Sequence, residues 1–427
     1  MKEDILNLKP VFSTLYGKDP ETLELQIRRY GELMDFFGKE FNEQELHYFS
    51  TPGRTEIGGN HTDHNHGRVL AGSINLDSIA IASPNQTDQI TVYSIGYDDP
   101  FIVDLQNLEA SKEEYGTTTS LIRGIASRLK ELGYKIGGFN ACITSDVLPG
   151  SGLSSSASIE VLIGNIFSAL FNNDGIKPEV LALTGQYAEN NFFGKPCGLM
   201  DQVACAMGGI VTIDFKDPQE PVIKKVDFDF DAQEYSLVVV DTGGTHADLT
   251  DDYASVPVEM KSVAQALGGN VVRDLTLDDL ITGMQKLRGK TGDRALLRAL
   301  HFIGDNERVV EQVQSLENND FNRFLQLVND SGNSSYKRLQ NIYSTKNVKE
   351  QGVALTLALS EIYLGEINAG ACRVHGGGFA GTIQVFLPND AVQKYSDYIE
   401  SVMGKGSVHV LKIRSLGTLH LNHYLTK

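Results

Sequence analysis

The feature that most constrains the fold is a glycine- and serine-rich turn between an apolar stretch and a helix-like segment, VLPGSGLSSSASIE at residues 147–160. Glycine lets a backbone turn sharply and come close to a ligand. The serines stand where a helix should begin, so its free N–H groups and positive dipole end face the turn. This arrangement favours phosphate binding. It lacks the GK[ST] of a Walker loop and the third glycine of a Rossmann fingerprint. A capped helix after a glycine turn is the structural alternative.

The length of the chain, 427 residues, exceeds one ordinary core and predicts two domains. Proline and charge cluster at 216–222, which places the boundary between an N-terminal domain, 1–218, and a C-terminal domain, 219–427. The N-terminal tract mixes strands and helices without regular βαβ alternation, which is typical of an α+β fold.

The net charge of −18 argues against a nucleic-acid partner or an anionic membrane surface. No apolar run approaches the roughly 18 residues that span a bilayer, and the N-terminus, MKEDILNLKPVF, has no apolar signal core. The four cysteines lack metal-binding spacing and read as reduced thiols: Cys142, Cys197, Cys205 and Cys372. We therefore expect a cytoplasmic protein.

Apolar spacing predicts the main elements. In the first half we expect helices over 20–37, 117–133, from the serine turn to about 171, and 178–191, with strands within 48–103, over 138–145 and within 208–241. In the second half we expect helices over 257–267, 276–288, 292–303, 305–317, 320–330 and 347–366, and strands over 380–387 and 408–413.

Polar side chains crowd a second glycine-rich segment, TPGRTEIGGNHTDHNHG at 51–67. Its carboxylate, imidazole and amide groups suit the hydroxyl pairs of a neutral polyol. A metal site formed by His61, His64 and His66 with Asp63 is one alternative, although HxxHxH is not a standard zinc spacing. A solvated loop is another.

Two further segments carry candidate groups. Asp201 stands alone in an otherwise uncharged run, LMDQVACAMGG, so its carboxylate should be partly buried and needs a partner, for which Arg54 is suitable. Glu189 precedes it on a predicted helix. The segment RVHGGGFAGT at 373–382 allows close backbone approach to the 51–67 segment or to phosphates, or simple packing against a neighbour.

Together these four segments resemble the motifs of the GHMP small-molecule kinases, and within them the galactokinases, in order and over nearly the whole chain. The resemblance implies an α+β fold with an N-terminal ribosomal-S5-like domain, a C-terminal ferredoxin-like domain with added helices, and an active site between them. It also implies ATP and Mg²⁺, and a sugar phosphorylated at the anomeric C1 hydroxyl. We expect a monomer.

The resemblance also implies roles for individual residues. Asp201 is similar to the catalytic aspartate and Arg54 to its partner, while Ser156 and Glu189 match the magnesium ligands. Expected sugar contacts are Asn60, His61, Thr62, Asp63, Asp201 and Tyr253. Expected nucleotide contacts are Ser94, Gly150, Ser151, Gly152, Leu153, Ser154, Ser155 and Ser156.

Two departures from the family pattern bear on sugar choice. Asn60 stands where the family has a glutamate that meets the C6 hydroxyl, and Glu56 stands where the family usually has asparagine. An amide at position 60 would accept either galactose or a sugar with a C6 carboxylate, such as galacturonate. A catalytically silent sugar sensor, or a kinase for another alcohol such as mevalonate or homoserine, is a further alternative.

Overall fold

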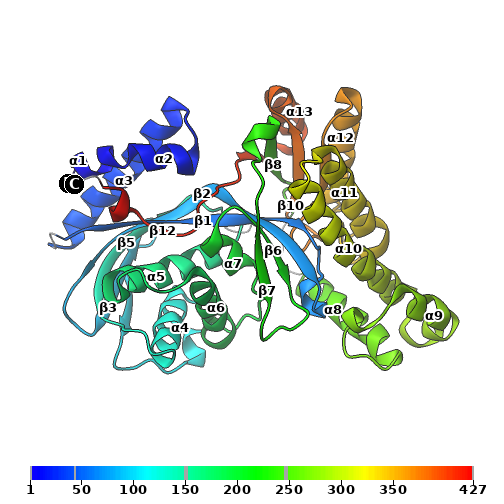
Figure 1. The fold of residues 1–427 in the computed structure, drawn as a ribbon, viewed down its shortest axis with the longest axis horizontal. Coiled ribbons are helices and arrows are strands. Elements are labelled where there is room, and N and C mark those ends of the chain that lie inside the picture. The colour runs from blue at the N-terminus through cyan, green and yellow to red at the C-terminus, as the bar shows by residue number, and fades with distance from the viewer. Residues whose placement is uncertain (1, 43–44, 149–151, 245–248, 426–427) are drawn as a thin grey trace.

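Two β-sheets and the helices that cover them make up the computed structural model, which describes residues 2–42, 45–148, 152–244 and 249–425 (Figure 1). The larger sheet joins β12 (Leu419–His420), β1 (His47–Gly58), β2 (Arg68–Pro84), β5 (Phe139–Ser145), β3 (Gln89–Ser94) and β4 (Phe101–Asp104), in that order. β6 (Ile210–Asp214) also pairs with β2, and β7 (Val222–Val226) pairs with β6. β3 and β5 run parallel, while the other pairs are antiparallel.

Helices cover both faces of this sheet (Figure 1). One face carries α4 (Thr118–Glu131), α5 (Ser155–Asn172), α6 (Pro178–Ala188) and α7 (Met200–Met207), and the other carries α1 (Lys2–Asn7), α2 (Lys9–Tyr16) and α3 (Pro20–Glu40). Strand β2 serves both cores because successive side chains point to opposite faces. Ala80 and Ala82 belong to the α4–α7 core, and Ile79 and Ile81 belong to the α1–α3 core.

The smaller sheet is antiparallel and joins β11 (Val408–Leu411), β8 (Tyr235–Asp241), β10 (Thr382–Pro388) and β9 (Ala371–His375). In chain order these are the fourth, first, third and second strands of the sheet, and helices follow the first and third. This is the βαββαβ order of a ferredoxin-like unit. Leu237 and Val239 face the core shared with the larger sheet, whereas Val238 and Val240 face α12 and α13.

The added helices lie between β8 and β9 in the chain. They are α8 (Thr250–Ala266), α9 (Leu277–Thr291), α10 (Asp293–Glu317), α11 (Phe321–Ser334) and α12 (Gly352–Ile367), and α13 (Val392–Met403) follows β10. Short helical turns connect elements at Asp63–Asn65, Lys112–Glu114, Glu189–Phe193, Asp231–Gln233, Val272–Asp274, Ser335–Leu339, Asn389–Ala391 and Leu421–Tyr424. Within the described ranges, no helix is long and apolar enough to cross a membrane.

Most predicted elements are confirmed, including the α+β class. The predicted break between helices 292–303 and 305–317 is wrong, because α10 runs unbroken through Gly304. Packing of buried side chains on both sides of it, such as Phe302 and Val309, outweighs the roughly 1 kcal/mol propensity cost of an interior glycine. All four cysteines are free thiols. The boundary at 218/219 stays a prediction, since β7 and β12 lie beyond it and still join the larger sheet.

Candidate active site

The predicted pair of Arg54 and Asp201 is present in the structure. Arg54 lies in β1, where a register shift next to Pro52 marks a bulge that redirects side chains. Asp201 lies in the first turn of α7. The guanidinium contacts both carboxylate oxygens, Nε to Oδ1 and Nη2 to Oδ2, each at 2.8 Å. This bidentate geometry is among the strongest that an arginine forms with a carboxylate.

The same two side chains hold the glycine–serine turn. Arg54 Nη1 donates to the carbonyl of Gly152, and the hydroxyl of Ser154 donates to Asp201 Oδ2. Burial alone would raise the pKa of Asp201, but the charge and hydrogen bonds of Arg54 and the Ser154 hydroxyl together lower it below its ordinary value. With its side chain 33% exposed, Asp201 presents an ionised oxygen to the solvent side of the turn.

The turn itself requires glycine and an unusual backbone at Ser154. Gly152 has φ +73° and Ser154 has φ +60°, both in the left-handed region. A Cβ on Gly53 would lie 2.8 Å from the carbonyl oxygen of Leu153, so β1 packs directly against the turn. Ser154 uses its hydroxyl on Asp201 and does not cap α5, which begins at Ser155. Gly150 and Ser151 lie outside the described residues, so the phosphate cradle stays a prediction.

Ser156, in the first turn of α5, and Glu189, directly after α6, lie close together. Ser156 Oγ lies 3.5 Å from Glu189 Oε1, and the side chain of Lys195 lies 3.4 Å from the same oxygen. Hydroxyl and carboxylate oxygens are the ligand types that Mg²⁺ prefers. The pair therefore fits a magnesium ion chemically, although the metal role remains a prediction.

Two buried residues that sequence reasoning missed support this pair. The amide nitrogen of Gln202 lies 3.1 Å from Glu189 Oε2 and 3.0 Å from Glu160 Oε2. Burial raises the pKa of Glu160 well above its ordinary value, and the nearby Glu189 charge adds to that. Because Gln202 follows Asp201 directly, the first turn of α7 positions both the proposed base and the proposed metal ligand.

The loop after β1 (residues 59–67), the glycine-rich loop after β9 (residues 376–381) and the start of α8 contact one another. His61 Nε2 lies 2.8 Å from the carbonyl of Gly377, and the Tyr253 hydroxyl donates to the carbonyl of Gly378 at 2.9 Å. A Cβ on Gly377 would lie 2.0 Å from the Tyr253 ring, so only glycine fits. Asp63 Oδ2 lies 2.6 Å from the Cβ position of Gly198, in the loop that leads to Asp201. Burial lowers the pKa of His61 to about 4, so the imidazole is neutral.

Asn60 and Thr62 hold the loop after β1, residues 59–67, in place. The Asn60 amide nitrogen donates to Glu56 Oε1 and to the Gly376 carbonyl, and its oxygen accepts from Ser335 and Asn341, at 2.6–3.2 Å. All four hydrogen-bonding positions of this amide are therefore used within the protein. The Thr62 hydroxyl lies within 2.8 Å of the backbone oxygens of Gly59 and Arg68. Their direct contact with a sugar stays a prediction.

The two departures from the family pattern are neighbours in space. Glu56 Oε1 lies 3.0 Å from the Asn60 amide nitrogen and 2.6 Å from Arg373, and all three residues are buried. One carboxylate and one amide occupy positions 56 and 60, as in the family, with their places exchanged. A carboxylate therefore remains within hydrogen-bond distance of position 60.

This arrangement predicts the effect of reversing the exchange. Asn60→Glu puts a second carboxylate beside Glu56 in a buried site and leaves partners unsatisfied, so we expect the free energy of unfolding to fall by about 1–3 kcal/mol. Glu56→Asn combined with Asn60→Glu restores one carboxylate and should recover part of that loss. Chemical denaturation of both single variants and the double variant measures the coupling. If the losses of stability in the two single variants simply added in the double variant, the coupling between positions 56 and 60 would be contradicted.

His375 is a further residue that the sequence did not single out. Its Nε2 lies 3.1 Å from the Thr55 hydroxyl and its Nδ1 lies 2.9 Å from that of Thr382. The Cβ position of Gly152 is 3.3 Å from His375 Nδ1, so the ring forms part of the wall behind the turn. Burial, with the positive charges of Arg54 and Arg373, lowers the pKa of His375 to about 3 and keeps it neutral.

Two other expectations have different outcomes. Ser94 ends β3 beside Ile143 of β5, and its nucleotide contact stays a prediction. Asp63, His61, His64 and His66 are not gathered as a metal site. His61 is bonded to the Gly377 carbonyl, and the one His/Cys/Asp/Glu cluster that the described residues bring within metal-binding distance lies elsewhere.

A cavity of about 990 Å³ between α11 and α12 contains none of the predicted site residues.

Comparison with known proteins supports the class of this fold. The family model described as GHMP kinases N terminal domain matches residues 120–209, and the one described as galactokinase galactose-binding signature matches residues 35–84. The fold is similar to a Lactococcus lactis galactokinase crystallised with galactose, with a TM-score of 0.77 and 24% identity over 92% of this chain and 100% of that one. It is also similar to a mevalonate kinase, with a TM-score of 0.58 and 16% identity over 85% and 97%. The fold and the site thus define a GHMP-type small-molecule kinase.

Curated relatives narrow this class. A galactokinase of Glaesserella parasuis serovar 5 is 31% identical over 365 residues, which cover 82% of this chain and 89% of the relative. One from Actinobacillus pleuropneumoniae serotype 5b is 30% identical over 366 residues, covering 84% and 89%. The chain belongs to the galactokinase family.

Proposed function

We propose that this protein transfers the γ-phosphoryl group of ATP to the C1 hydroxyl of galactose. The observation that carries the proposal is the ionised, partly exposed carboxylate of Asp201, held by Arg54 and by Ser154 of the turn that should cradle phosphate. Membership of the galactokinase family supports the choice of sugar, as does the carboxylate retained at position 56.

In the proposed reaction the C1 oxygen attacks the γ-phosphorus, the new C1–O–P linkage forms, and the bond to the β,γ-bridging oxygen breaks to release ADP. Asp201 accepts the hydroxyl proton. Arg54 keeps that carboxylate ionised and fixes its direction, while His61, Asp63 and Tyr253 orient the sugar. Such reactions depend mainly on positioning and electrostatics. When bound, Mg²⁺ would be held by Ser156 and Glu189 and would neutralise charge on the phosphate oxygens.

A sugar panel tests the proposal. ADP release is coupled to a spectroscopic readout with galactose, galacturonate, arabinose and N-acetylgalactosamine as acceptors. We expect galactose to give the highest kcat/KM. Galacturonate above galactose would overturn the substrate assignment. Sugar binding by calorimetry without sugar-dependent ADP release would indicate a sensor instead of a kinase.

The proposed metal pair gives a separate prediction. Glu189→Gln removes the carboxylate that faces Ser156, so we expect kcat/KM for magnesium–ATP to fall about 10–100-fold while galactose binding is retained. Initial rates as a function of MgATP at saturating sugar measure the change. Glu179→Gln, at the other end of α6, is the matched control. Equal effects of the two substitutions would exclude Glu189 from the metal site.

We further propose that residues 1–218 and 219–427 form the two domains, and that the protein acts as a cytoplasmic monomer. The second sheet draws all its strands from beyond residue 218, which supports the domain boundary. Light scattering on the purified full-length chain tests the monomer.

A further inference from the structure

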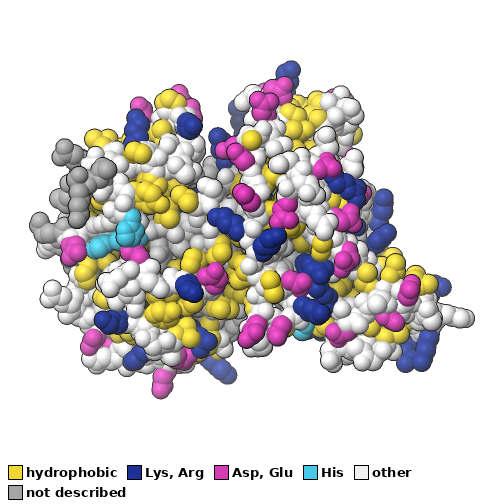
Figure 2. Space-filling model, in the orientation of Figure 1, with side chains coloured by type: hydrophobic (Ala, Val, Ile, Leu, Met, Phe, Trp, Pro, Cys, Tyr) yellow, Lys and Arg dark blue, Asp and Glu magenta, His cyan; other side chains and the backbone are white. Residues whose placement is uncertain are grey.

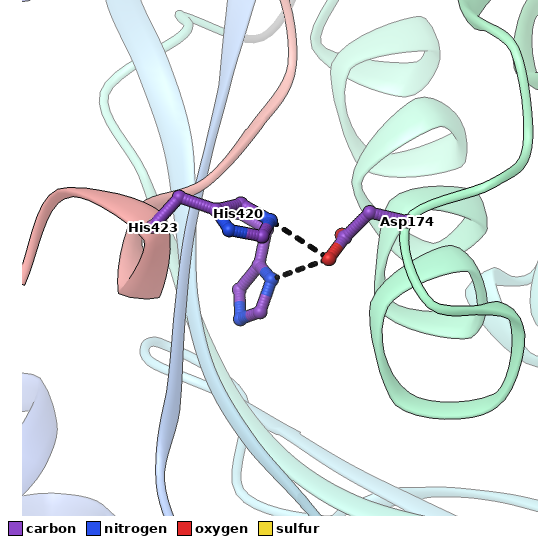
Figure 3. Close-up of side chains that lie close together, drawn as sticks. All are labelled: Asp174, His420 and His423. Carbon is purple, nitrogen blue, oxygen red and sulfur yellow. Dashed lines mark hydrogen bonds and ion pairs between the residues drawn. The ribbon is translucent and has the colours of Figure 1, made fainter.

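A cluster outside the kinase site brings two histidines and an aspartate together (Figure 3). Asp174 lies in the turn after α5, His420 lies in β12, and His423 lies in the helical turn that follows. Asp174 Oδ2 is 3.1 Å from His420 Nδ1 and 2.8 Å from His423 Nε2. Histidine side chains are visible together at the left of the face in Figure 2. None of the three residues has a part in the proposed phosphoryl transfer.

The spacing of these donors fits a metal ion. All three donor atoms lie within 4.8 Å of one another. Zn²⁺ binds histidine nitrogen and carboxylate oxygen at about 2.0–2.2 Å, which in a tetrahedral site puts neighbouring ligands about 3.4 Å apart. The 2.8 and 3.1 Å separations are already close to that value, and His423, with its side chain 62% exposed, can move outward to reach it.

Side chains behind His420, the buried member of the cluster, fix the orientation of its ring. His420 Nε2 lies 3.0 Å from His47 Nδ1, and His47 Nε2 lies 3.4 Å from Glu45 Oε1. The His420 ring also stacks on Phe49, with centroids 5.0 Å apart and planes at 18°. The side chain of His420 is 9% exposed, so its position is fixed by packing before any ion arrives.

The hydrogen bonds along this row are compatible with a bound ion. If His420 Nδ1–H donates to Asp174, then His47 Nδ1–H must donate to His420 Nε2, and the lone pair of His47 Nε2 faces the Glu45 carboxylate. If His420 Nδ1 instead binds a metal, its Nε2–H donates to His47 Nδ1, and His47 Nε2–H donates to Glu45. In the second arrangement the Glu45 carboxylate also receives a hydrogen bond, and the lone pair of His420 Nδ1 is left for a metal ion. Carboxylate-to-histidine support of this kind is usual behind metal ligands.

We propose that Asp174, His420 and His423 bind a first-row divalent transition metal ion of the zinc type, which fastens the C-terminal segment to the turn after α5. Imidazole donors select such ions over Mg²⁺, which prefers oxygen ligands. The segment already pairs with β1, where His420 lies opposite Phe49, so the ion would add a second attachment to the same segment. This site is independent of the proposed kinase activity.

Calorimetric titration of the full-length chain, free of any polyhistidine tag, with Zn²⁺ in excess Mg²⁺ tests the site. We expect one Zn²⁺ per chain. His423→Gln and Asp174→Asn keep a side chain that can hydrogen-bond but remove a good ligand, so each should weaken binding at least about tenfold. His409→Gln, in β11, is the matched histidine control and should bind as the wild type does.

Two further readouts separate a metal site from a simple hydrogen-bonded attachment. His47→Leu, which touches no metal, should also weaken Zn²⁺ binding about tenfold, because it removes the support behind His420. Co²⁺ should give visible absorption bands that His423→Gln abolishes. Absence of saturable Zn²⁺ binding, or unchanged affinity in His423→Gln, overturns the proposal. Since His423 is on the surface, His423→Gln decides the matter even if a buried variant fails to fold.

Discussion

Replacing Asp201 with asparagine is expected to reduce kcat about 10²–10⁴-fold, the range that a positioned general base supplies. The amide can still accept a hydrogen bond from Arg54, but it cannot take the proton of the sugar hydroxyl. Galactose binding, measured by calorimetry, should be retained, while loss of the charge opposite buried Arg54 should lower the free energy of unfolding. Rates close to those of the wild type would remove Asp201 from the base role.

A matched control is available in β6. Asp214 is 26% exposed and also bonds to arginine, at 2.8 Å to Arg68 and 2.9 Å to Arg273, but it lies outside the proposed site. Asp214→Asn removes a similar ion pair, so any loss of stability should resemble that of Asp201→Asn while kcat is retained. Equal losses of kcat in the two variants would show that the effect of Asp201→Asn is structural.

The largest effect on stability is expected for Asp77→Ala. Asp77 is fully buried in β2, where its carboxylate contacts Arg29 of α3 at 2.6 Å, Arg414 at 3.1 Å and the hydroxyl of Tyr16 at 2.6 Å. Removing one partner leaves buried cations uncompensated, which costs about 3–5 kcal/mol. Chemical denaturation at neutral pH should show this loss. Asp146→Asn, which removes an Arg29 partner that is 44% exposed, should cost below about 1 kcal/mol.

The same carboxylate predicts a pH dependence. Burial would raise the pKa of Asp77, but Arg29 and Arg414 lower it below its ordinary value. A depressed folded-state pKa contributes stability above the unfolded pKa of about 3.9 and loses it as the pH falls through the folded value. The wild type should therefore lose stability below about pH 5, and Asp77→Ala should lose less over the same range. Parallel pH profiles of the two proteins would contradict this role.

Local patterns predicted most elements but not those that depend on distant partners. The run at 20–37 has helical apolar spacing and forms α3, and the apolar run at 235–241 forms β8. Sequence patterns did not predict the short helix α7, because glycine-containing segments on both sides of it are typical of loops. The Asp77 network was also missed, since Arg414 lies 337 residues away and no motif marks either residue.

The candidate site likewise has features that the sequence predicted and features that it could not predict. The isolation of Asp201 in an apolar run predicted that its carboxylate needs a partner, for which Arg54 was suitable, and the structure pairs these two side chains. The hydrogen bonds of Asn60 could not be predicted, because Ser335 and Asn341 are 275 and 281 residues away. The sequence shows both departures at positions 56 and 60, but only the structure shows that the two side chains are hydrogen-bonded to each other.

The central claim is that Asp201 activates an anomeric hydroxyl for attack on ATP. Phosphorus NMR of the reaction of full-length protein with ATP and galactose tests it most directly. A phosphomonoester signal coupled to the anomeric proton should appear in step with ADP, and it should not appear within the same time for Asp201→Asn. Phosphate on another carbon, or inorganic phosphate as the only product, would contradict the claim.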